Sequence, residues 1–124
     1  MIQIKTVSLA DRLAEELSKT GLPFRVDTWE NKAPSNYGVV ELTGQNNADW
    51  ADGVMVDQAF QAEITIYVAG SSMKWIGMIQ DKLAAMDAGY SLPQRQWLPD
   101  IKKTAWTWRA TFFGPMEWEE ITEV

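Results

Sequence analysis

The chain contains no cysteine and no histidine. It therefore lacks the side chains that form disulfides, cysteine or histidine zinc sites, thiol nucleophiles and histidine-based catalytic triads. The eight glycines are scattered, so the sequence has no glycine-rich phosphate-binding loop. Any catalysis would have to rest on carboxylates, and no pair among the 17 acidic residues stands out. We therefore expect no enzyme activity, no bound metal and no cofactor.

Positive charge is also scarce. Eleven Lys and Arg residues face 17 Asp and Glu residues, which gives a net charge of −6. This balance argues against a general nucleic-acid-binding protein, which needs a basic surface. No apolar run is long enough to cross a bilayer, and the N-terminus does not have the pattern of a signal peptide. We expect a protein made and used in a cytoplasm.

Tryptophan, by contrast, is abundant, with seven in 124 residues. Tryptophan is enriched in protein cores and in interfaces between chains. Some of the seven are therefore candidates for contact with another chain. Trp29 beside a loop, Trp50 in a long polar segment and Trp118 in the C-terminal tail are the three that we single out.

The segment 58–68 has the clearest pattern in the sequence. Apolar residues recur at every second position, while Gln61, Glu63 and Thr65 occupy the alternate positions. This alternation predicts a strand of an antiparallel sheet with one buried face. The residues predicted to be buried are Phe60, Ala62, Ile64, Ile66 and Val68.

Two helices are predicted on either side of this strand. The first covers 8–19, where Ser8 and Asp11 have capping spacing and leucines recur every four residues. The second covers 73–87, with Ser72 as a cap and an apolar stripe from Ile76 to Met86.

Further strands are predicted at 24–29, 37–43 and 104–113, with a short one near Tyr90. The order α-β-β-β-α-β predicts a single α+β domain over residues 1–124. It would have a mainly antiparallel sheet of four or five strands, with two helices packed on one face. Arg109 and Glu63 are expected to pair across strands on the polar face.

The polar segment 45–53 predicts a loop with strong turn-forming residues. Asp49, Asp52 and Asp57 raise the alternative of a divalent-metal site, but their spacing does not match a calcium-binding loop. A solvated turn is the better interpretation, with Asp52-Gly53 leading tightly into the next strand.

The tail 116–124 has two interpretations that we rank equally. It is either a frayed terminus, or an arm that docks on a neighbouring chain through Trp118 and Ile121.

The whole pattern resembles a known family. An N-terminal helix leads to a Leu22-Pro23-Phe24 strand entry, and a loop ending Asp52-Gly53 precedes the strand that begins at Phe60. A Ser72-capped helix and a Trp- and Phe-rich last strand follow. In this order the chain is similar to the tail terminator, or minor capsid and tail-completion, proteins of long-tailed bacteriophages and prophages.

The resemblance implies a structural virion protein that is assembled in the host cytoplasm and ends up in the neck region of the tail. Such proteins form a ring, usually a hexamer, that caps the head-proximal end of the tail tube. The ring stops tube polymerisation and presents a surface to the head connector or stopper protein. DNA would pass through the lumen without specific binding, which suits an acidic chain. Candidate subunit or partner contacts are Trp29, Trp50, Asp52, Trp118 and Ile121.

Two alternatives remain open. A head-completion or stopper protein of the neck would also form a ring without chemistry. A small monomeric adaptor would instead bind a protein ligand through the segment around Trp50.

Overall fold

The computed structural model describes residues 2–29, 33–51, 54–70, 72–114 and 117–123, and it describes side chains outside 45–58 and 117. The described residues form two helices and eight strands. In chain order they are β1 (Ile2–Ser8), α1 (Leu9–Ser18), β2 (Phe24–Val26), β3 (Tyr37–Ala51), β4 (Val54–Ala69), α2 (Ile76–Ala85), β5 (Gly89–Tyr90), β6 (Gln94–Leu98), β7 (Lys103–Phe113) and β8 (Glu117–Glu123).

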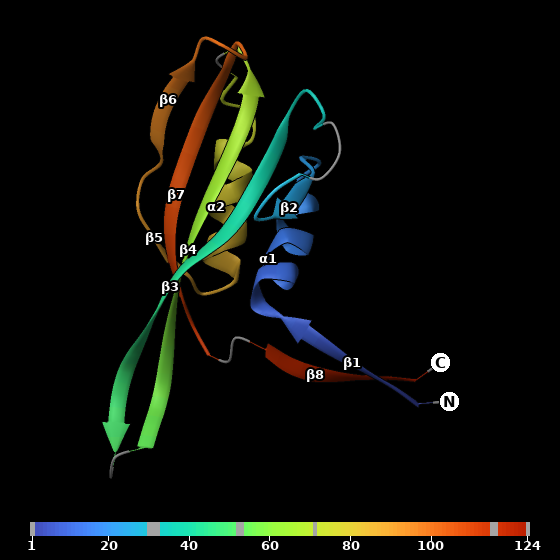
Figure 1. Ribbon diagram of the computed structural model, residues 1–124, viewed down its shortest axis with the longest axis vertical. Helices are drawn as coiled ribbons and strands as arrows, with labels where there is room; N and C mark the ends of the chain where they lie inside the picture. The colour runs from blue at the N-terminus through green and yellow to red at the C-terminus, as the bar shows by residue number, and fades with distance from the viewer. Residues whose placement is uncertain (1, 30–32, 52–53, 71, 115–116, 124) are drawn as a thin grey trace.

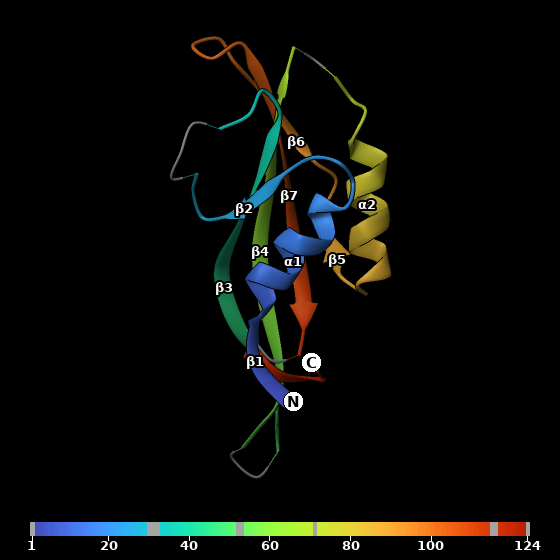
Figure 2. The same cartoon turned by 90° about the vertical axis from the view of Figure 1, so that its right-hand side faces the viewer.

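A large sheet forms the body of the molecule. Its strand order is β2-β3-β4-β7-β5, and β6 also pairs with β7. All its pairings are antiparallel except that of β2 with β3. Both helices lie on one side of this sheet, while the other side is open (Figure 1 and Figure 2). The predicted α+β class, with two helices on one face of a mainly antiparallel sheet, is therefore confirmed.

The core lies between the sheet and the helices. The alternating residues of β4 are all buried, as predicted, because they face the apolar stripes of α1 and α2. Trp108, Ala110 and Phe112 of β7 join them on the same face. The fully buried side chains of greatest volume are Trp108, Phe60, Leu13, Leu17, Leu22, Ile64, Ile66, Ile79 and Leu83.

Helix α1 begins at Leu9, directly after the predicted cap residue Ser8. Ser8 Oγ accepts a hydrogen bond from the Asp11 backbone N–H at 3.1 Å, which satisfies one of the free donors of the first turn. The helix ends before Gly21, whose φ of 96° is a left-handed conformation that favours glycine. The stripe of Leu13 and Leu17 is completely buried.

Helix α2 is shorter than predicted. It begins at Ile76 rather than Met73, and its N-cap is Trp75, which makes no side-chain capping bond. The Ser72 hydroxyl accepts from the Lys74 backbone N–H at 3.4 Å, in a turn that precedes the helix. The prediction of a Ser72 cap was therefore wrong, although the apolar stripe is confirmed by the burial of Ile79 and Leu83.

Strand β2 is also shorter than the predicted 24–29. It ends at Val26 because Asp27 has a positive φ of 65°, which turns the chain out of the sheet. Trp29 therefore lies beyond the strand.

The predicted loop at 45–53 is wrong over 45–51, and its Asp52-Gly53 turn lies outside the described residues. The chain continues as strand, so that β3 runs to Ala51 and pairs with β4 through Ala51↔Val54. Register shifts after Leu42 and after Asn47 mark bulges that let the hairpin leave the plane of the sheet. Strand β7 accompanies β4 only from Ala59 onward, so the end of the hairpin extends beyond the body (Figure 1).

Three further strands were missed. The segment predicted to be irregular between Tyr90 and Asp100 contains β6, while the short strand near Tyr90 is confirmed as β5. The N-terminal residues form β1, and the tail forms β8. These two strands pair along their whole length as a separate two-stranded ribbon, which we call the terminal arm (β1 and β8).

Candidate functional site

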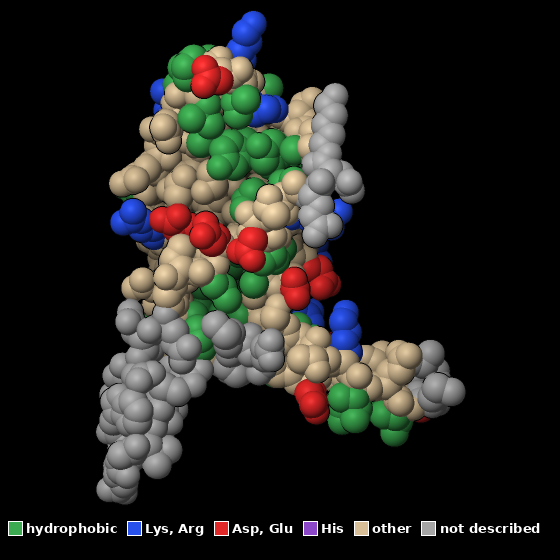
Figure 3. Space-filling view, in the orientation of Figure 1, with side chains coloured by type: hydrophobic (Ala, Val, Ile, Leu, Met, Phe, Trp, Pro, Cys, Tyr) green, Lys and Arg blue, Asp and Glu red, His purple; other side chains and the backbone are tan. Residues whose placement is uncertain are grey.

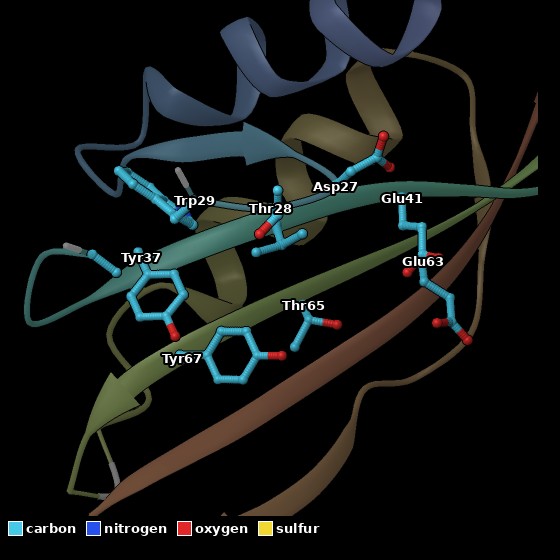
Figure 4. Close-up of a pocket in the computed structure, with 10 residues that line it drawn as sticks. Asp27, Thr28, Trp29, Tyr37, Glu41, Glu63, Thr65 and Tyr67 are labelled. Carbon is cyan, nitrogen blue, oxygen red and sulfur yellow. The ribbon is translucent and has the colours of Figure 1, made fainter. Parts of the chain in front are cut away.

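A pocket of about 440 Å³ lies on the open face of the main sheet. Its floor consists of side chains of β3 and β4 that point away from the helices, and its rim comes from the segment after β2 (Figure 4). The residues labelled in Figure 4 are Asp27, Thr28, Trp29, Tyr37, Glu41, Glu63, Thr65 and Tyr67.

Aromatic side chains form one end of this pocket. The rings of Tyr37 and Tyr67 stack at 4.9 Å between centroids, because these residues are direct cross-strand partners. Trp29 meets Tyr37 edge to face, and its indole N–H donates to the Gly38 carbonyl at 3.3 Å. Burial, and next the neighbouring Tyr67, raise the pKa of Tyr37 above its usual range. A tyrosine hydroxyl is protonated at neutral pH, and the raised pKa extends this to more alkaline pH, so the hydroxyl can donate a hydrogen bond.

Carboxylates form the other end. Glu41 and Glu63 are direct cross-strand partners, an arrangement that places two like charges together. Arg109 Nε lies 3.4 Å from Glu63 Oε1, which confirms the predicted cross-strand pair and offsets one of the two charges. In the space-filling view, acidic side chains cross the middle of this face in a band (Figure 3).

The side chains of the pocket can bind a ligand through charge and aromatic contacts. Carboxylates beside aromatic rings suit a cationic side chain, which gains both ion pairing and cation–π contact. Two of the rings already have basic neighbours, since Arg25 lies over Trp29 and Lys103 lies over Tyr37. Among the residues whose side chains are described, no three carboxylates gather as a metal site would require.

An ion pair and a buried valine connect the terminal arm to the body. Arg12 of α1 forms an ion pair with Glu120 of β8, and the Trp118 indole N–H donates to the same carboxylate at 3.0 Å. The hydrogen bond from Trp118, assisted by the charge of Arg12, lowers the pKa of Glu120. Val7 is buried on this side of the arm, whereas the rest of the arm points away from the body (Figure 1).

The opposite side of the arm is apolar and exposed. Ile4 and Ile121 are direct cross-strand partners, and 65% and 74% of their surfaces are accessible to solvent. Ile2 lies two residues further along the same side and is 69% exposed. Isolated exposed apolar residues are ordinary, but three together on a ribbon with no third strand in the described part of the chain mark a contact surface.

The structure separates the five predicted interface residues. Trp29 is half-buried in the wall of the pocket, while Trp118 and Ile121 lie on the two sides of the arm. The backbone of Trp50 lies in β3, near the end of the β3–β4 hairpin, and its side chain is outside the described residues. Asp52 also lies outside the described residues.

Sequence reasoning did not identify several exposed apolar residues. Ile2 and Ile4 alternate in the sequence, but two residues are a weak signal for a strand. Trp97 of β6 is 44% exposed and was not singled out, because its segment lies between two prolines and was predicted to be irregular.

No protein-family model matches this chain, and no curated protein matches it. In the part of the chain that the structure describes, neither helix is long and apolar enough to cross a membrane.

Proposed function

We propose that this protein is a structural subunit that assembles into a ring, and that it acts as a tail terminator of a long-tailed phage or prophage. The observation that carries the proposal is the terminal arm, whose exposed isoleucines lie on a ribbon outside the main sheet. The family resemblance of the sequence supplies the specific biological role.

Energetic considerations support an assembly role for the arm. A two-stranded ribbon is only marginally stable in water unless a third strand or another surface packs against it. Docking of Ile2, Ile4 and Ile121 on another chain would remove their apolar surface from water and stabilise the ribbon.

The β3–β4 hairpin gives the subunit a second projection. Its outer part pairs with no strand of the body among the described residues, so it is available to reach a neighbour or the tail tube. The net charge of −6 favours a lumen through which DNA passes without adhering, because like charges repel.

Disruption of the gene in its source genome tests the proposal. Electron microscopy of the lysate should show overlong or length-scattered tubes without heads. Tails of normal length beside unattached or DNA-leaking heads would instead support the head-completion alternative. Intact, infectious particles would contradict both neck functions.

One observation favours a second candidate, a monomeric adaptor. The pocket on the open face combines carboxylates with aromatic rings and would suit a basic peptide. This candidate requires that the chain stays monomeric when concentrated and that Glu41→Gln weakens binding of a lysine- or arginine-rich peptide.

A further inference from the structure

Strand β6 leaves one edge of the main sheet open. It pairs only with β7 among the described residues, so its other edge presents unpaired backbone donors and acceptors. Arg95 and Trp97 are both exposed, lie on the same side of this strand and are two residues apart. No described carboxylate pairs with Arg95.

Strand β8 of the terminal arm has a matching pattern. It pairs only with β1 among the described residues, so it too has a free edge. Glu119, Ile121 and Glu123 are exposed and lie at every second position, on the side of the arm that carries Ile4. An apolar residue is thus flanked by two carboxylates at the spacing of a strand.

From this match we infer that β8 of one copy of the chain pairs with the free edge of β6 in a second copy. Ile121 then lies beside Trp97, and Arg95 lies beside a carboxylate, which is Glu119 or Glu123 according to strand direction. Apolar and opposite-charge cross-strand pairs both stabilise a sheet. Backbone hydrogen bonds between the added strand and β6 supply the remaining stabilisation, as in other cases of strand addition.

The β8 strand that fills this edge belongs to another copy, because the shape of the subunit keeps its own arm away from β6. The arm and β6 lie on opposite sides of the body (Figure 1), so an arm cannot reach the edge of its own chain. The contact therefore joins two different surfaces, and such head-to-tail contacts close into rings when the rotation between subunits permits. This inference rests on the proposed ring function and specifies its subunit contact.

Engineered disulfides provide the test, because the natural chain has no cysteine and the background is zero. Cross-strand partners have Cβ atoms about 4.5–5.5 Å apart, close enough for disulfide formation after a small adjustment. Oxidation traps even a transient contact, so we expect the variant carrying both Ile121→Cys and Trp97→Cys to give a ladder of covalent oligomers although its apolar pair is lost. A mixture of the two single variants should give covalent dimers only.

A matched control replaces Trp97→Cys with Met73→Cys, at a position that is 65% exposed but remote in sequence from the edge. This control should give no ladder. A ladder from this control would overturn the inference, because cross-linking would then not depend on the β6 edge. Covalent dimers from Ile121→Cys alone would also overturn it, because they would mean that arms pair with arms.

Charge exchange provides an independent readout. In the double-cysteine variant, Arg95→Glu should abolish the cross-linking, and adding Glu119→Lys with Glu123→Lys to the same chain should restore it. Oligomers seen by sedimentation without any cross-link would refute this contact but leave the ring proposal standing. A chain that is monomeric at its highest soluble concentration and never cross-links would refute both.

Discussion

Gly38 is required by the packing of a neighbouring side chain. It lies in β3 opposite Phe24 of β2, and a Cβ at this position would overlap the Phe24 ring. The ring therefore packs directly on the backbone of β3, and this contact brings β2 and the start of the pocket rim against the sheet.

Replacing Gly38 with alanine should destabilise the protein by about 1–3 kcal/mol, because the added methyl group overpacks a filled site. Gly77→Ala is the control, since a Cβ there meets no atom within 4 Å. Alanine at that helical position should be neutral or stabilising by about 1 kcal/mol. Urea unfolding of both variants measures the difference, and equal stabilities would contradict the packing described for Phe24.

Ile64 and Ile121 offer a second matched pair. Ile64 is fully buried in β4, whereas Ile121 is 74% exposed on the arm. Ile64→Ala should lower the free energy of unfolding by about 2–5 kcal/mol, because it leaves a cavity. Ile121→Ala in the dilute monomer should change it by less than about 0.5 kcal/mol. Normal stability of the Ile64 variant would refute the core assignment.

We predict that attachment of the arm through Glu120 depends on pH. Its pKa is below the ordinary value of 4.5, so its ionised form stabilises the folded state above that pH. This stabilisation disappears as the pH falls through the lowered pKa. We expect Glu120→Gln to lose stability at pH 7 and to show a weaker acid dependence below pH 4.5 than the natural chain. Identical acid-denaturation curves for the two proteins would contradict this role.

Some of these residue roles could be read from the sequence, and others could not. The Ser8 cap and the pair of Arg109 with Glu63 follow from local spacing and strand alternation, and both are present. The pocket could not be predicted, because its residues come from three segments of the chain that the β2–β3 and β3–β4 pairings bring together.

The terminal arm and the β3–β4 hairpin both project from the body, and the sequence predicted neither of them fully. The sequence suggests one strand of the arm, since a docking arm is one of the two interpretations of the tail. It does not predict the partner strand β1. Apolar residues of β8 fall at positions 118 and 121, which do not alternate, so the strand had no clear signal. Its pairing with β1 joins the two ends of the chain, and no local pattern can indicate such a contact.

The β3–β4 hairpin was missed for a different reason. The segment 45–53 is rich in Asn, Asp and Gly, which favour turns and are depleted in strands. Pairing with the strongly patterned β4 overrides that local preference. Only two residues separate the strand ends at Ala51 and Val54, as the Asp52-Gly53 pair in the sequence allows.

Trp50 tests the role of the hairpin. Its backbone lies where β3 pairs only with β4, beyond the reach of β7. We predict that Trp50→Ala changes the stability of the monomer by less than about 0.5 kcal/mol, as for a surface substitution. It should weaken association by about 2 kcal/mol or more, as for a central interface tryptophan. A large loss of monomer stability would mean that the side chain packs on the body.

At the scale of the whole molecule, the layout explains why the fold class was predictable while the topology was not. Alternation in β4 and β7 indicates a sheet with one buried face, and the apolar stripes of the two helices indicate what covers that face. The terminal arm depends on pairing between the two ends of the chain, whereas the β3–β4 hairpin and β6 run through segments whose residues favour turns. These are also the features that suit a subunit that is completed by its neighbours.

The most direct test of assembly through the arm is the mass of the purified chain in solution, measured by light scattering over a range of concentrations. We predict a closed oligomer of several chains for the natural protein at high concentration. For the variant carrying both Ile4→Ser and Ile121→Ser, we predict a folded monomer whose melting temperature, when dilute, is unchanged. A natural chain that stays monomeric throughout, or a variant that assembles as well as the natural chain, would contradict assembly through the arm.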